Sequence, residues 1–89
     1  MKRRARTNPE ITNFVIGCRD ASQLQEEIRA IIDDETPDVD RLEPCLREAI
    51  GAVKRASATG LGGKRIRSEL NGFEQYCKSL LEIIVGQQH

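Results

Sequence analysis

Apolar residues recur at spacings of three and four along most of the chain, as expected for α-helices that each bury one face. The clearest run lies near the C-terminal end, where spacings of four and three alternate through Ile66, Leu70, Phe73, Cys77, Leu80 and Ile84. This heptad seam predicts a helix from Lys64 to about Val85, with Gly86 as its stop. Asn71-Gly72 is the weak point where a second helix can start.

The first apolar stripe covers residues 9–34 and keeps its helical phase throughout. Asn8, followed by a proline, has the residue type of a helix N-cap. Gly17 and the segment 20–22 can end one helix and cap another, so this stretch forms either one long helix or two. We favour a break near residues 18–21.

The acid-rich segment 33–38 predicts a turn, because acids at a helix C-terminus oppose the helix dipole and its proline disfavours helical geometry. Asp38 or Asp40 can cap the helix that follows. Since proline deep inside a helix costs about 3 kcal/mol, we expect a short turn at 39–43 and a helix over 44–58 that opens on its proline. A glycine-rich run then ends this helix.

These elements predict an all-α fold, a small antiparallel helical bundle of three long or four shorter helices in up-and-down order. We expect a flexible basic arm at residues 1–8, a single helical domain at 9–86 and a frayed C-terminus at 87–89. With 89 residues, the chain can build only a thin core.

Composition bears on the environment of the protein. Charged residues make up 31% of the chain, and the mean hydropathy is −0.50. No apolar run approaches the roughly 18 residues needed to cross a bilayer. The basic start Met1–Arg6 is followed by too short an apolar stretch for a secretory signal. We therefore expect a cytoplasmic protein with no membrane partner.

Residue types for catalysis or metal binding are sparse. The cysteines are odd in number and form no C-x-x-C pair, so we expect free, buried thiols at Cys18, Cys45 and Cys77. The single histidine, His89, is the last residue. The acids fall on exposed helical positions or in the turn. We therefore expect no enzyme activity, no cofactor and no metal site.

The formal net charge is zero, but the charges are unevenly distributed. Residues 9–48 hold 11 acids and four bases, whereas residues 49–68 hold five bases and no acid. The candidate residues for binding phosphates or an acidic partner are the bases of the arm and of the loop 54–67: Lys2, Arg3, Arg4, Arg6, Lys54, Arg55, Lys64, Arg65 and Arg67. The alternative is an ordinary solvated charged surface. A nucleotide-binding P-loop is excluded, because Ala58 and Arg65 replace the required glycine and hydroxyl residue.

The first and last helices also carry more apolar residues than one thin core can take. These residues either pack between helices or form a patch for another chain, and we name as a candidate interface Phe14, Val15, Ile16, Leu81, Ile83 and Val85. The sequence thus predicts a small non-enzymatic protein–protein interaction module, a regulator, adaptor or inhibitor, whose partner is another protein or a second copy in a homodimer. The alternative is a nucleic-acid-associated protein that contacts phosphates through the basic arm and loop.

Overall fold

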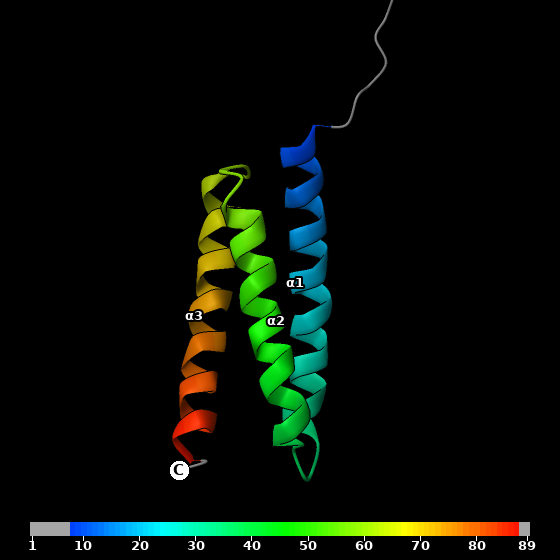
Figure 1. The fold of residues 1–89 in the computed structure, drawn as a ribbon, viewed down its shortest axis with the longest axis vertical. Helices are drawn as coiled ribbons and strands as arrows, with labels where there is room; N and C mark the ends of the chain where they lie inside the picture. The colour runs from blue at the N-terminus through cyan, green and yellow to red at the C-terminus, as the bar shows by residue number, and fades with distance from the viewer. Residues whose placement is uncertain (1–7, 88–89) are drawn as a thin grey trace, which may run out of the picture.

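The computed structural model describes residues 8–87, which form three α-helices and no strand (Figure 1). The helices are α1 (Pro9–Asp33), α2 (Val39–Ser57) and α3 (Lys64–Gln87). They run up and down in chain order, which confirms the predicted all-α class and its three-helix form. Most of the expected basic arm, residues 1–7, lies outside the described residues, as do residues 88–89 of the expected frayed end.

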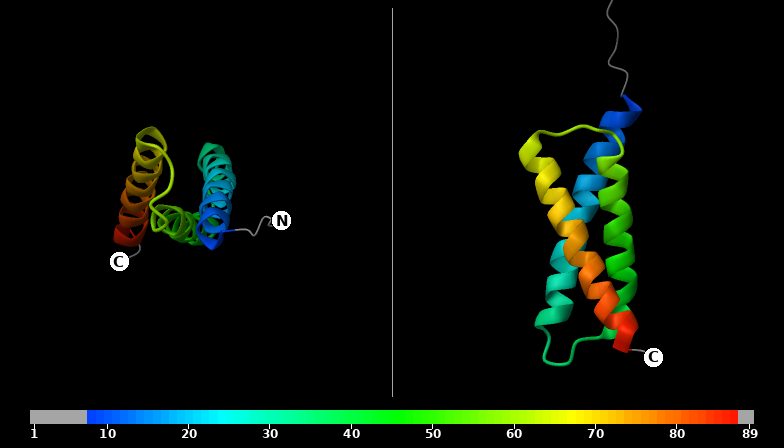
Figure 2. Two further views of the ribbon diagram at one scale, coloured as in Figure 1. Left: turned by 90° about the horizontal axis from the view of Figure 1, so that it is seen from above. Right: turned by 90° about the vertical axis from the view of Figure 1, so that its left-hand side faces the viewer.

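The three helices do not close around one another. α2 packs against both α1 and α3, whereas no Cα atom of α1 comes within 8 Å of one in α3. Viewed along the bundle, the helices form a U with α2 at its base (Figure 2). The fold therefore leaves the side between α1 and α3 open.

The hydrophobic core follows α2 and consists of two clusters. One cluster lies toward the connection between α1 and α2 and contains Ile28, Ile31, Leu42, Cys45, Leu46, Ala49, Cys77 and Ile84. The other lies toward the connection between α2 and α3 and contains Ala21, Ala52, Val53, Ala56 and Leu70. The second cluster is made mostly of small side chains, so the helices must approach closely there to remain packed.

α1 is one uninterrupted helix, so the predicted break near residues 18–21 is wrong. Asn8 caps it as predicted, since its Oδ1 accepts a hydrogen bond from the Glu10 amide at 2.8 Å. Gly17 is buried against α2, and a Cβ atom there would lie 2.9 Å from both the Ala52 carbonyl oxygen and the Ala56 Cβ. This glycine serves the close contact of two helices and does not end one.

α2 begins earlier than expected, and the predicted turn at 39–43 is wrong. Asp38 caps the helix, because its Oδ1 accepts a hydrogen bond from the Arg41 amide at 3.3 Å. Pro44 is the sixth residue of α2, where the missing N–H removes the bond to the Asp40 carbonyl. Burial of Leu42 and the residues that follow it compensates for that loss.

The connection between α2 and α3 uses glycine as predicted. Gly60 and Gly62 have φ angles of 72° and 89°, in the left-handed region that other residues avoid. α3 then runs without a break through Asn71-Gly72, and it continues past Gly86, so the predicted stop there is wrong. From Leu70 onward the seam packs in the core along α2 and maintains the helix across its weak helix formers, whereas Ile66, predicted as the first seam residue, is exposed.

Candidate functional site

The open side of the U contains a groove of about 690 Å³. Its walls are Cys18, Ala21, Ser22 and Gln25 of α1 and Ile66, Glu69, Leu70, Gly72, Phe73 and Tyr76 of α3. A smaller hollow of about 110 Å³ shares Gln25 and Tyr76 with it and extends along α1 to Asp33. We call these two hollows together the α1/α3 groove.

Large apolar side chains remain exposed beside this groove. Six are exposed among the described residues: Ile11 (51%), Val15 (54%), Val39 (39%), Ile66 (37%), Tyr76 (49%) and Ile83 (55%). Ile66 and Tyr76 line the groove directly. Ile83 lies seven residues, or two helical turns, beyond Tyr76 and therefore continues the same side of α3.

A spacing of seven residues also places two exposed residues of α1 on the groove side. Ile11 lies seven residues before Cys18, and Val15 lies seven residues before Ser22, so both point to the groove side of α1. Five of the six exposed large apolar side chains therefore belong to the two helices that border the groove. Only Val39, the first residue of α2, lies elsewhere.

The N-terminal half of the predicted interface is divided among three environments. Phe14 packs against the alanine-rich core cluster, and its ring lies 2.9 Å from where a Cβ of Gly62 would be. Val15 is exposed on the groove side. Ile16 is half-buried and lies one turn before Asp20, which faces a different hollow.

The C-terminal half of the predicted interface is divided as well. Leu81 and Val85 line a separate hollow of about 440 Å³ beside Arg47, on the other side of α3, and Leu81 also packs on the core. Ile83 belongs to the groove side. Because α1 and α3 run in the same direction, Phe14–Ile16 and Leu81–Val85 lie at opposite ends of the bundle (Figure 1). The structure does not bring the two halves together.

Three exposed residues of the groove side, Ile11, Ile66 and Tyr76, were absent from the predicted interface. For Tyr76 the sequence contains a signal, since Tyr76 and Ile83 each precede a seam residue by one position and lie seven residues apart, whereas Ile66 belongs to the seam itself. That signal becomes interpretable only when the neighbour of each helix face is known. The U-shaped arrangement supplies this information, because it leaves one flank of α3 without a neighbour.

The charged residues separate toward the two ends of the bundle. Five exposed bases gather where α2 ends and α3 begins: Lys54, Arg55, Lys64, Arg65 and Arg67. Arg55 also bridges to α1, where its guanidinium lies 3.4 Å from Asp20 Oδ2. The predicted arm residues Lys2, Arg3, Arg4 and Arg6 lie outside the described residues.

The opposite end of the bundle is acidic. Segment 33–40, which joins α1 to α2, contains five acids and no base, all exposed: Asp33, Asp34, Glu35, Asp38 and Asp40. We call 54–67 the basic end and 33–40 the acidic end. The neutral chain is thus a dipole along the axis of the bundle.

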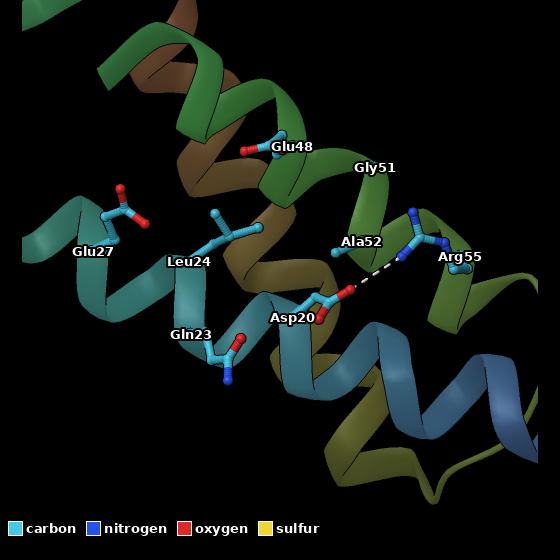
Figure 3. Close-up of a pocket in the computed structure, with 8 residues that line it drawn as sticks. All are labelled: Asp20, Gln23, Leu24, Glu27, Glu48, Gly51, Ala52 and Arg55. Atoms are coloured by element: carbon cyan, nitrogen blue, oxygen red, sulfur yellow. Dashed lines mark hydrogen bonds and ion pairs between the residues drawn. The ribbon is translucent and has the colours of Figure 1, made fainter. Parts of the chain in front are cut away.

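A second hollow, of about 360 Å³, lies between α1 and α2 away from the groove. Figure 3 shows polar side chains of both helices around it, with the Asp20–Arg55 ion pair spanning its rim. Glu27 in its wall also pairs with Arg41 at 3.2 Å. Ion pairs thus already engage Asp20 and Glu27, and no group of three or more metal-ligating side chains occurs among the described residues.

The three cysteines are free, as predicted. Cys45 and Cys77 are buried, whereas Cys18 is half-buried and so departs from the predicted burial. Burial raises the pKa of Cys18, and burial raises that of Cys77 to about 11 with help from the negative charge of Glu74. Burial raises the pKa of Cys45 too, together with a hydrogen bond to Glu27 and the negative charges of Glu27 and Glu48. Because the thiolate is the reactive form, these cysteines are poor nucleophiles near neutral pH.

Within the described residues, no helix has the length and apolar content required to cross a bilayer. Comparisons of the chain with known protein families, with curated proteins and with solved structures gave no match. The groove and the charged ends are therefore the features of this chain that bear on its function.

Proposed function

We propose that this protein is a non-enzymatic, cytoplasmic helical interaction module, acting as a regulator, adaptor or inhibitor, that binds another protein chain in the α1/α3 groove. One observation carries the proposal: five of the six large apolar side chains exposed among the described residues lie on the two helices that border the groove. Apolar surface gathered in this way marks interaction sites on small proteins.

The energy available from this surface is substantial. Full burial of a large apolar side chain contributes about 1.5–3 kcal/mol, so each half-exposed residue retains about 1 kcal/mol for a partner. Ile11, Val15, Tyr76 and Ile83 together then offer about 4 kcal/mol, which corresponds to about a thousandfold in affinity. This burial energy offsets part of the cost of association, and further contacts along the groove must supply the rest.

The test compares two variants that each place a carboxylate at an exposed, large apolar residue. Tyr76→Asp puts the charge in the groove, whereas Val39→Asp puts it at the N-terminus of α2, outside the groove. From a nuclease-treated native lysate, we expect the unmodified chain and Val39→Asp to retain the same protein partners. Tyr76→Asp should lose them. Retention of an identical set by all three chains would refute the groove as the binding surface.

A second function, nucleic-acid association through phosphate contacts, is supported by the five exposed bases that share one end of the bundle. Such contacts give binding without sequence readout, and the affinity falls steeply as salt is raised. Arg65→Glu combined with Arg67→Glu should abolish this binding, whereas Tyr76→Asp should leave it intact. Failure of the unmodified chain to shift DNA or RNA at low salt would reject this function.

A further inference from the structure

We infer that the occupant of the α1/α3 groove is a second copy of this chain, docked antiparallel so that the basic end of each copy lies against the acidic end of the other. This inference rests on the proposed function and names the partner of the same groove. Three observations carry it: the area of the open side, the central place of Tyr76 on α3, and the separation of charge along the bundle.

The open side has the area that a stable dimer needs. α3 has 24 residues and is about 36 Å long at 1.5 Å per residue, and two neighbouring helices are about 20 Å wide. The open side therefore measures about 700 Å² per copy, close to the 800 Å² or so per partner of a standard interface. A short peptide would leave much of the exposed apolar stripe uncovered.

The apolar stripe on α3 suits a two-fold axis perpendicular to the bundle. Tyr76 lies near the middle of α3, and Ile83 follows it by about 10 Å on the same helix face. Ile66 lies about 15 Å before Tyr76 and about 80° round the helix from it, but it also lines the groove. With the axis near Tyr76, this tyrosine meets its own counterpart, and Ile66 of one copy faces the end of α3 that carries Ile83 in the other. Such a self-complementary patch is what a symmetric dimer requires.

The separation of charge selects the antiparallel orientation. Segment 54–67 carries five bases and no acid, and segment 33–40 carries five acids and no base. Antiparallel docking places opposite charges together at both ends, whereas parallel docking places like charges together at both ends. The zero net charge also removes the general repulsion between copies.

Gly72 in the groove wall adds support. A Cβ atom at this position would meet nothing within 4 Å in the single chain, so packing within one copy does not require a glycine there. Glycine in a helix interior costs about 0.5–1 kcal/mol relative to alanine. Gly51 on α2 also meets nothing within 4 Å, so open space alone identifies no partner. At Gly72 the missing side chain leaves room in the groove for the backbone of a partner helix.

Sedimentation over a range of protein concentrations provides the main test. The unmodified chain should convert from monomer to dimer as the concentration rises. Val39→Asp, which adds a sixth acid to the acidic end and leaves the groove unchanged, should dimerise at least as tightly. Tyr76→Asp brings two carboxylates together at the axis and should weaken the dimer at least about a hundredfold. Circular dichroism of each variant establishes that it folds. A dimer that Tyr76→Asp leaves intact would overturn the inference, because its interface would lie elsewhere.

Charge exchange between the ends tests the orientation. Arg65→Glu with Arg67→Glu reverses the basic end, Asp33→Lys with Glu35→Lys reverses the acidic end, and each pair alone should weaken the dimer. All four substitutions together should restore it, since opposite charges then meet again. High salt should weaken the unmodified dimer. A dimer that strengthens in high salt, or four substitutions that fail to restore it, would contradict the antiparallel arrangement.

The possible failures are distinguishable. A chain that remains monomeric at near-millimolar concentration overturns the second copy as occupant. If Tyr76→Asp then still loses a protein that Val39→Asp retains, the groove binds a different protein and the proposed function stands. If neither variant changes the set of proteins retained from the lysate, both the inference and the proposed function are rejected.

Discussion

Gly17 shows how a single residue sets the distance between two helices of this bundle. Its neighbours on α2 are alanines, and the Ala52 carbonyl and Ala56 Cβ occupy the space that a side chain would need. In the sequence, the same glycine resembles a helix end, because glycine has that role most often. The difference arises because the packing partner is more than 30 residues away along the chain.

Gly17→Ala is expected to lower the free energy of unfolding by about 1–3 kcal/mol, the cost of overpacking a close contact. Gly51→Ala is the matched control, since a Cβ there meets nothing within 4 Å. That control should gain up to about 1 kcal/mol from helix propensity. Urea denaturation measures both variants, and equal stability of the two would show that Gly17 is not required for the α1–α2 contact.

The buried thiol of Cys77 makes the stability of the folded state depend on pH in the alkaline range. Burial raises its pKa from the ordinary value of 9.0 to about 11, so its neutral form stabilises the folded state. This contribution is complete below pH 9 and is lost as the pH rises from 9 toward 11. Stability should therefore fall more steeply over that window than it does in Cys77→Ala. Identical pH profiles from thermal melts would contradict the assignment.

At the scale of whole helices, sequence periodicity identified where helices form better than where they end. The heptad seam predicted α3 as a single helix, Asn8 was recognised as a cap, and Asp38 was one of the two caps predicted for α2. Pro44 was given too much weight, because local propensity was judged without the core that overrides it. Hydrophobic burial beneath α2 extends that helix back past Pro44, whereas α3 ends one residue beyond Gly86.

Substitution of Gly72 separates the effect of this glycine on the stability of α3 from its effect on dimer formation. Gly72→Ala should raise the stability of α3 in dilute, monomeric protein by about 0.5–1 kcal/mol. The same change should weaken the dimer, because the added methyl group projects into the groove. Thermal melts at low concentration and sedimentation at high concentration measure the two effects. A variant that is more stable and dimerises as well as the parent would show that the dimer does not require a glycine at position 72.

At the scale of the whole molecule, the arrangement of helices decides which apolar residues are available to a partner. The sequence indicated an excess of apolar residues and an uneven distribution of charge, and both features exist in the structure. It could not indicate that α1 and α3 stay apart, because that depends on how each helix packs on α2. Tyr76 therefore resembled an ordinary helical position until the open groove placed it at the centre of an exposed wall.

The charged ends follow from the same arrangement. Segments 33–40 and 54–67 are separated by most of α2, so a straight helix places them at opposite ends of the bundle. The charge blocks were visible in the sequence, but their direction along one axis required the fold. The separation of charge along this axis favours one orientation of a partner that binds in the groove.

The most direct test of groove occupancy by a second copy is the rate at which iodoacetamide labels Cys18, which lies in the groove wall and is half-buried. Labelling is followed by mass spectrometry at one mildly alkaline pH, because burial raises the pKa of this thiol. Buried Cys45 and Cys77 serve as internal references. We expect the labelling of Cys18 to slow as the protein is concentrated from micromolar to near-millimolar, and to stay constant in Tyr76→Asp. A rate that does not change with concentration in the unmodified chain would contradict occupancy of the groove by a second copy.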